Sequence, residues 1–224
     1  MSYDQNNRGF SLVELLIAMT VTLVVMSITS VLLASTFNVR SRENQRSDAL
    51  ADAQRALNIM SRELANSGFG LTDNGIVAAD SDLSSIRVRA NLNAFEGATT
   101  SNLISDRNED IKYMLWQSGA DSYIVRLDIG TQNQTTVLAN RVDALRIRYY
   151  PSRIDYTMAP NAGACDISTA SSEVTSKALT KYIVMTLCVE LPPVGQPNAP
   201  GYQPRSRVQL VSDVYLRNGD ITSY

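Results

Sequence analysis

Gly9-Phe10-Ser11-Leu12-Val13-Glu14-Leu15-Leu16-Ile17-Ala18-Met19 opens a long apolar stretch in which Glu14 is the only charged residue. The stretch has about the ~20 apolar residues that a membrane-spanning helix needs. A carboxylate at the centre of a bilayer costs about 2.5–3.5 kcal/mol on insertion scales, and less near the end of the helix. The position of Glu14 therefore predicts a partner or a functional role for its carboxylate.

The residues from Gly9 to Ala18 resemble the type III signal of type IV prepilins and type II secretion pseudopilins. In that family a dedicated peptidase cuts after the glycine, and the new N-terminal residue is methylated. The resemblance implies a leader at 1–9, cleavage between Gly9 and Phe10, and N-methylation of Phe10. It also implies that Glu14 meets the N-terminal amine of a neighbouring subunit, so that Glu14 is an assembly residue.

Elementary electrostatics agrees with this role for Glu14. The carboxylate of Glu14 and the amine of Phe10 can neutralise each other across a subunit boundary, which relieves a desolvation cost. Two alternatives are an ordinary signal anchor, with Glu14 inactive at the headgroups, and a secretory signal peptide. No Ala-x-Ala-like cleavage site follows the apolar run, which argues against the second.

Composition argues against an enzyme. The chain has 224 residues, a formal net charge of −2 and no histidine. The absence of histidine excludes His-dependent triads and HExxH metalloprotease sites. The sequence also lacks a glycine-rich phosphate loop and a Gly-x-Ser-x-Gly elbow. We expect no catalytic residues, no cofactor and no metal. Asp73, Asp80 and Asp82 could bind calcium, but they lack EF-hand spacing.

A single helix is predicted from Phe10 to about Asn66. Residues 10–37 form its membrane-spanning or filament-core part, and 38–70 form an amphipathic continuation that glycines end. Five apolar residues follow a helical stripe in the second part, and we expect this stripe to pack on the rest of the chain. They are Leu50, Ala53, Leu57, Met60 and Leu64, with Arg55, Arg62 and Glu63 off the stripe.

Residues 71–224 are predicted to form a β-rich head. Alternating apolar residues predict strands at 85–92, 111–117, 123–129, 135–139, 142–150, 182–191 and 207–217. A short hairpin turn is expected at 118–121, and the segment 175–180 is ambiguous, with a helical turn as one interpretation. No helical run separates the strands, so the sheet should be mostly antiparallel. The fold class is therefore α+β, with the long N-terminal helix packed on the sheet.

Cys165 and Cys188 are the only cysteines. In an oxidising compartment they predict one disulfide, and two free buried thiols are the alternative. In the strand at 182–191, Cys188 shares a face with Tyr182 and Val184, opposite the face expected to meet the helix stripe. Five prolines between 192 and 204 predict an exposed linker, with a partner-binding loop as the alternative.

Four arginines offer a possible contact with nucleic acid. Arg87 with Arg89, and Arg146 with Arg148, each share one face of a predicted strand. If the two strands were neighbours, the guanidinium groups could bind phosphates. Strand exteriors are often charged, however, and Asp110, Glu109 and Asp143 are available as partners, so a solvated face is the favoured interpretation.

The segments Ala56–Phe69 and Val214–Asn218 resemble those of PilW-type minor pilins. This implies a minor pilin that helps to initiate a type IV pilus at or near its tip. A GspJ-type type II secretion pseudopilin is the first alternative, and a DNA-uptake minor pilin with a DNA-binding head the second. The implied partners are other minor and major pilins or pseudopilins, the prepilin peptidase and an inner-membrane assembly platform. The implied location is the bacterial inner membrane, single-pass with a periplasmic head, and then the pilus or pseudopilus.

Overall fold

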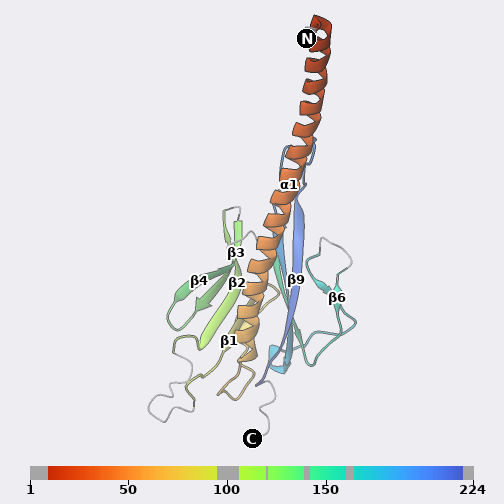
Figure 1. Cartoon of the computed structure of the whole chain (residues 1–224). Coiled ribbons are helices and arrows are strands. Elements are labelled where there is room, and N and C mark those ends of the chain that lie inside the picture. Colours follow the sequence, from red (N-terminus) through yellow and green to blue (C-terminus); the bar gives the residue numbers. More distant parts are fainter. Residues whose placement is uncertain (1–9, 95–105, 120, 139–141, 160–163, 219–224) are drawn as a thin grey trace, which may run out of the picture. The chain divides into compact units, whose positions relative to one another are not determined.

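The structure is a computed structural model that describes residues 10–94, 106–119, 121–138, 142–159 and 164–218 (Figure 1). The chain divides into two compact units. One contains the residues up to Asn44 together with Pro193–Arg205, and the other contains Gln45–Pro192 and the residues from Ser206 onward. The proline-rich segment is thus grouped with the N-terminal residues. Each unit is described separately below.

Helix α1, Leu12–Ala65, contributes residues to both units. It confirms the helix predicted for 10–66 to within two residues at each end. The hydroxyl groups in its apolar part bond to carbonyl groups of their own helix, which satisfies them without water. These residues are Thr20, Thr22, Ser27, Thr29, Ser30 and Thr36.

The helix ends shortly before Gly68, a glycine with a positive φ. Asn66 N and Ser67 N donate to the carbonyls of Glu63 and Leu64, so the last turn tightens before Gly68. Gly68 has a φ of 79°, in the left-handed region where residues with a Cβ are strained. Its N–H donates to Arg89 O at 2.9 Å, which ties the end of the helix to the first strand.

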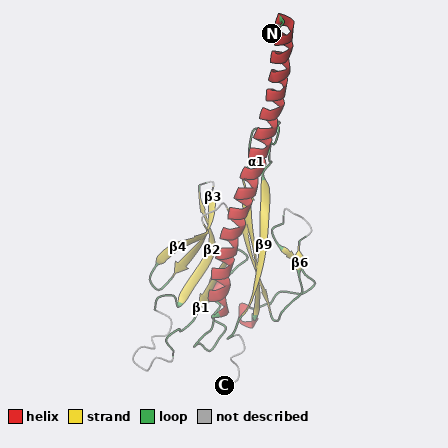
Figure 2. Ribbon diagram, viewed as in Figure 1, coloured by secondary structure: helices red, strands yellow, loops and turns green. Residues whose placement is uncertain are grey.

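The second unit contains two antiparallel sheets (Figure 2). Strands β1 (Ser85–Arg89), β2 (Asp110–Ser118), β3 (Asp121–Asp128) and β4 (Asn133–Leu138) pair in sequence order. Strands β5 (Val142–Tyr150), β8 (Tyr182–Leu191) and β9 (Ser206–Tyr215) form the other sheet, with β8 in the centre. The predicted hairpin turn is confirmed, since Ser118 pairs with Asp121.

Shorter elements complete this unit. Two 3₁₀ turns lie at Ala78–Asp80 and Lys177–Leu179, the second within the segment for which a helical turn was considered. Strands β6 (Thr157–Met158) and β7 (Ile167–Ser168) form a small ladder that the sequence did not predict. Two-residue strands carry too little alternation to be recognised from the sequence.

The main core lies between α1 and the inner faces of the sheets. Ala53, Leu57, Met60 and Leu64 of the predicted stripe are buried there, and Leu50 is half-buried at its edge. The inner-face residues of β8 join the same cluster, as the alternation predicted: Ile183, Met185, Leu187 and Val189. The apolar stripe of the helix packs against the inner-face residues of the strand, so the helix and the sheet share one core.

The opposite face of β8 has its own, smaller cluster. Tyr182 and Val184 pack there with Tyr150, Ile154 and Ile167. The predicted disulfide is present, joining Cys165 to Cys188 over a Cα–Cα distance of 5.9 Å. It holds the segment before β7 against this outer face.

The prolines of Pro193–Arg205, called the proline loop below, predicted an exposed linker. The segment also has hydrogen bonds of its own. Val194 and Gln203 pair across it, with both N–H···O distances at 2.9 Å. Within its unit the loop packs on α1, where Arg42 donates from Nη2 to Pro204 O. The prolines exclude a central strand, as expected, but they do not exclude a closed loop.

Candidate assembly site at the start of the long helix

The candidate site is built on the first turn of α1. Phe10 and Ser11 precede the helix, and Leu15 N donates to Ser11 O at 3.1 Å, the first bond of the helical ladder. Gly9, the expected cleavage residue, lies outside the described residues. Phe10 is 82% exposed, and Glu14 lies exposed in the first turn.

The start of a helix suits an acidic side chain. The unpaired N–H groups of the first turn carry partial positive charge, which favours a carboxylate nearby. Glu14 occupies this position with no other ionisable residue until Arg40. The arrangement thus leaves one carboxylate exposed near a helix end, on a surface that is otherwise apolar.

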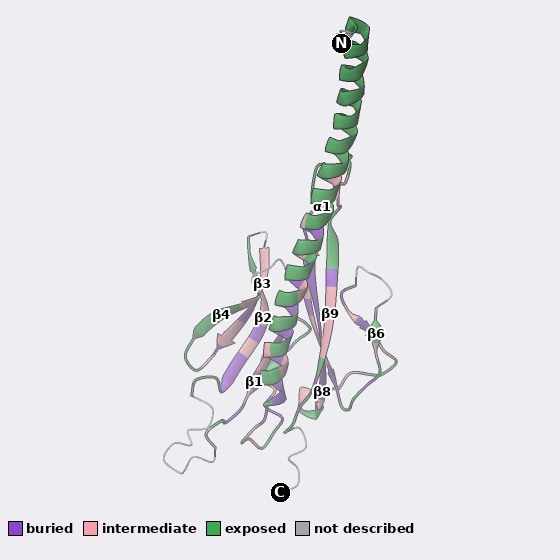
Figure 3. Ribbon diagram, viewed as in Figure 1, coloured by how far each residue is buried: buried purple, intermediate pink, exposed green. Residues whose placement is uncertain are grey.

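The apolar surface that follows is exposed throughout the structure. Every residue from Leu12 to Ala34 is exposed, and α1 is long and apolar enough to cross a membrane (Figure 3). Large exposed apolar surfaces in a protein mark contact with lipid or with other chains. The geometry therefore suits a helix that is covered by a bilayer or by neighbouring copies of similar helices.

A phosphate-binding patch of the four arginines required their two strands to be neighbours. Their strands, β1 and β5, belong to different sheets and are not hydrogen-bonded neighbours. Arg87 forms a bidentate pair with Asp110 at 2.7 Å for each bond, and Nε of Arg89 donates to the same carboxylate at 3.0 Å. Carboxylates therefore pair with the guanidinium groups on β1, as the favoured interpretation expected for Asp110.

Arg148 on β5 is also paired with carboxylates. Its Nε donates to Asp166 Oδ1 at 2.8 Å, and its two terminal nitrogens contact Asp166 and Glu173. Desolvation alone would raise the pKa of Asp166, but hydrogen bonds from Arg148 and from the Ile167 N–H outweigh it and hold that pKa below its usual range. Arg146, two residues earlier on the same face, is half-buried. No contact of the described residues pairs its guanidinium group with a carboxylate in the way seen for Arg148.

The three aspartates considered for calcium already accept hydrogen bonds. Asp80 accepts from Arg87 and Lys112, Asp82 from the N–H groups of Ser84 and Ser85, and Asp73 from the N–H of Gly75. Hydrogen bonds from Arg87 and Lys112 are the main reason that the pKa of Asp80 is lowered. Within the described residues, no group of three or more acidic, histidine or cysteine side chains is placed to hold a metal ion.

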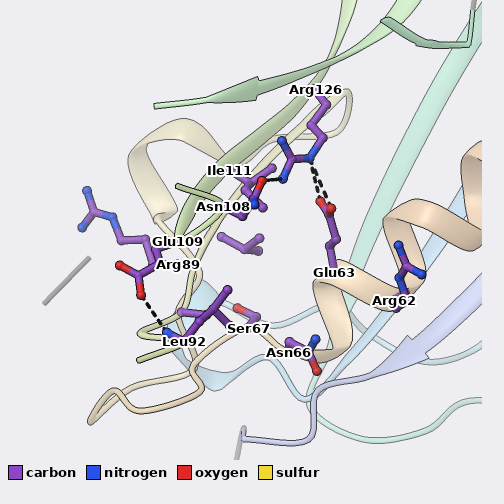
Figure 4. A pocket seen from close by; sticks show the side chains of 12 residues that line it. Arg62, Glu63, Asn66, Ser67, Arg89, Leu92, Asn108, Glu109, Ile111 and Arg126 are labelled. Atoms are coloured by element: carbon purple, nitrogen blue, oxygen red, sulfur yellow. Dashed lines mark hydrogen bonds and ion pairs between the residues drawn. The ribbon is translucent and has the colours of Figure 1, made fainter. Parts of the chain in front are cut away.

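A groove of about 310 Å³ lies at the end of α1 in the second unit, between that end of the helix and β1–β3 (Figure 4). Glu63 points into it and accepts from Arg126 Nε at 2.9 Å and from the hydroxyl of Tyr113. Burial, and next the charge of Glu63, raise the pKa of Tyr113. Arg126 also donates to Asn108 Oδ1 at 2.8 Å.

Polar groups of this groove therefore stabilise one another. Glu109, on its wall, accepts from the N–H groups of Leu92 and Asp106 and so links these two residues. Glu63 lies off the apolar stripe, as expected, but it is half-buried and its carboxylate meets Tyr113 of β2 and Arg126 of β3. Its spacing from buried Met60 indicates that it faces inward, whereas nothing local indicates its partners.

The comparisons with known proteins agree with the N-terminal features. Residues 4–37 match the family model described as the prokaryotic N-terminal methylation motif. No curated protein matches the sequence closely enough to count as a relative. Among solved structures, a type IV-like pilin from Thermus thermophilus has a TM-score of 0.42 and 14% identity, covering 75% of this chain and 97% of its own.

This structural likeness is too weak to carry an argument. The inference about function depends instead on the N-terminal motif and on the elements described above. A type III signal, an exposed apolar helix and antiparallel sheets packed on the second half of that helix occur together. This chain thus carries the prokaryotic N-terminal methylation motif at the start of an α+β fold, in which antiparallel sheets pack on the second half of a long helix.

Proposed function

We propose that this chain is a PilW-type minor pilin of a type IV pilus, a structural subunit that helps to initiate filament assembly at or near the tip. Before assembly, α1 anchors the chain in the inner membrane with the head in the periplasm. After cleavage between Gly9 and Phe10 and methylation of Phe10, the same helix joins the filament core. Its partners in this role are the prepilin peptidase, other pilins and the inner-membrane platform.

The observation that carries the proposal is Glu14. It is exposed, and it is the only charged residue in the described apolar stretch of α1. In a bilayer this carboxylate has a desolvation cost and no opposite charge on its own helix before Arg40. The amine of a neighbouring processed subunit would supply the missing charge, so assembly relieves a cost that the single chain bears.

A charge substitution tests this step. Glu14→Ala should leave the protein in the inner membrane and strongly reduce its recovery in sheared filaments. Glu43→Ala is the matched control, because Glu43 is an exposed carboxylate of the same helix beyond the apolar stretch, and it should assemble normally. Normal incorporation of the Glu14→Ala chain would contradict the proposed pairing.

Processing is tested separately by mass spectrometry of the protein from its native membrane. The proposal requires a mature chain that begins at Phe10 and carries one extra methyl group. Retention of Met1, or an unmodified start elsewhere, would rule it out. Deletion of the gene separates the two machines: loss of surface pili supports the pilus, whereas loss of protein secretion with pili intact supports the GspJ-type alternative.

A further inference from the structure

The proline loop is a closed and ordered structure. Besides the Val194–Gln203 pair, Ala199 N donates to Gln196 O at 3.0 Å and Tyr202 N donates to Ala199 O at 3.1 Å. These internal bonds form two successive turns between the paired ends. The loop therefore presents a defined surface.

Two glycines let this loop approach α1 closely. A Cβ at Gly201 would lie 2.4 Å from Ser35 Cα, and one at Gly195 would lie 2.8 Å from Asn38 Nδ2. Both glycines have positive φ, 76° and 85°, which a residue with a Cβ rarely adopts. Together with the buried Arg42, whose guanidinium bonds to Pro204 O, they fix the loop against residues 35–42.

The position of this contact along the helix matches the thickness of a bilayer. Ser35 lies 25 residues after Phe10, which is about 37 Å along an α-helix at ~1.5 Å per residue. A bilayer is about 40–45 Å thick with its headgroups, around a hydrocarbon core of about 30 Å. If Phe10 lies at one surface, the loop contacts the helix at the headgroup layer of the other.

The chemistry of the loop suits that layer. Tyr202 is half-buried, and tyrosine is enriched at membrane interfaces, where its ring is apolar and its hydroxyl is wet. Arg40 and Arg205 are exposed cations of the same unit, and with Arg42 they outnumber its one described acidic residue beyond the apolar stretch, Glu43. Its prolines have no N–H group to desolvate.

We propose that the proline loop is an interfacial collar that lies in the phospholipid headgroup layer, with Tyr202 at the boundary and Arg40 and Arg205 toward the phosphates. It would set how deeply α1 enters the bilayer before assembly. This inference rests on the membrane-anchored stage of the proposed function, and it adds a second contact with lipid beyond the apolar helix.

Fluorescence quenching in vesicles tests the depth of the loop. The full chain with Trp116→Phe, which removes the only tryptophan, is reconstituted in phosphatidylcholine with Tyr202→Trp. The lipids carry bromine either near the headgroup or near the chain ends. For an indole at the interface, we expect the shallow bromine to quench roughly twofold more strongly than the deep one.

A control separates this inference from the proposed function. In the same background, Leu23→Trp reports on the middle of the apolar stretch, and the deep bromine should quench it more strongly. If neither lipid quenches the indole at position 23, the chain does not span and the proposed function fails. If position 23 is quenched but the indole at 202 responds only to aqueous acrylamide, the collar alone is overturned.

The phosphate contacts have their own test. Adding phosphatidylglycerol to the vesicles should increase the shallow quenching of the indole at position 202. Arg40→Gln with Arg205→Gln should remove that increase and leave the quenching in pure phosphatidylcholine unchanged. An increase that survives both substitutions would overturn the role assigned to the two arginines.

Discussion

At the scale of single residues, Gly75 shows how closely two backbone segments pass in the second unit. Its φ is 74°, and a Cβ there would lie 2.3 Å from both Arg89 O and Gly68 N. Gly75 also accepts a hydrogen bond from Arg89 N at 2.8 Å, so the position joins the end of α1 to β1. Backbone atoms on both sides leave no room for a side chain.

Gly75→Ala should therefore destabilise the protein strongly. The left-handed conformation costs about 1–2 kcal/mol for a residue with a Cβ, and the backbone clash should bring the total to about 3 kcal/mol or more. Gly119→Ala is the matched control, since Gly119 has a φ of 64° but a Cβ added there would meet nothing within 4 Å. Urea unfolding of both variants gives the comparison, and equal losses would show that the clash does not matter.

Arg148 is the second residue with a specific energetic role. Its fork to Asp166 and its contact with Glu173 tie these two residues, which lie between β5 and β8, to the sheet. A partly exposed, multiply bonded pair of this kind contributes about 1–2 kcal/mol. We expect Arg148→Met to lower the free energy of unfolding by about that amount at neutral pH, and Arg146→Met to lower it less.

The pH dependence follows from the lowered pKa of Asp166. A carboxyl group whose pKa is lower in the folded state stabilises the fold above its unfolded pKa of about 3.9. That stabilisation is lost as the pH falls through the lowered folded value. The difference in melting temperature between wild type and Arg148→Met should accordingly shrink below about pH 4, and a difference that stays constant in acid would contradict the assignment.

At the scale of elements, the disulfide joins the centre of one sheet to a segment outside it. Cys188 lies in the buried central strand β8, and Cys165 lies 23 residues earlier, before β7. A crosslink closing a loop of this length stabilises the fold by about 3 kcal/mol in the chain-entropy model. The small outer cluster of Ile154, Ile167 and Tyr182 includes a residue of the same segment, since Ile167 lies two residues after Cys165.

We expect Cys165→Ala with Cys188→Ala to lower the free energy of unfolding by about 3 kcal/mol. A reducing agent should lower the urea midpoint of the wild type toward that of the double variant, and should not change the midpoint of the double variant itself. A midpoint of the wild type that is unaffected by full reduction would show that packing alone fixes the segment.

The elements also show what the sequence could and could not predict. Strand β5 was predicted at its observed bounds because burial of its inner face imposes a period of two. Strand β8 is buried on both faces, and its run of apolar and β-branched residues is typical of a central strand. The expected disulfide between Cys165 and Cys188 is confirmed. It could be predicted because the sequence contains only these two cysteines.

Periodicity says nothing about which strands become neighbours. The nucleic-acid hypothesis required the strands β1 and β5 to be neighbours, but they lie in different sheets, because tertiary packing sets strand order. The pair Glu63–Arg126 and the contact of Arg42 with Pro204 join residues 63 and 162 positions apart. Such contacts carry no local signal, so the groove and the proline loop emerge only from the structure.

At the scale of the whole molecule, the two units differ in where their apolar residues lie. The N-terminal unit exposes its apolar helix and buries little of it, whereas the second unit buries residues from α1 and from both sheets in one cluster. The proline loop is encoded between β8 and β9 but packs within the N-terminal unit. Truncation of the helix should consequently release the loop and leave the second unit folded.

A chain that begins at Gln45 tests this directly, because it lacks Ser35, Asn38 and Arg42 and keeps all residues of the second unit. Without those contacts, we expect trypsin to cut after Arg205 roughly tenfold faster than in the full chain, since cleavage follows the population of the opened loop. A chain that begins at Ala34 retains the three contact residues and should remain protected. Both truncated chains should keep the same cooperative unfolding of the second unit, so a difference at Arg205 reports on the loop. Equal cleavage rates in the two truncated chains would show that the helix does not hold the loop closed.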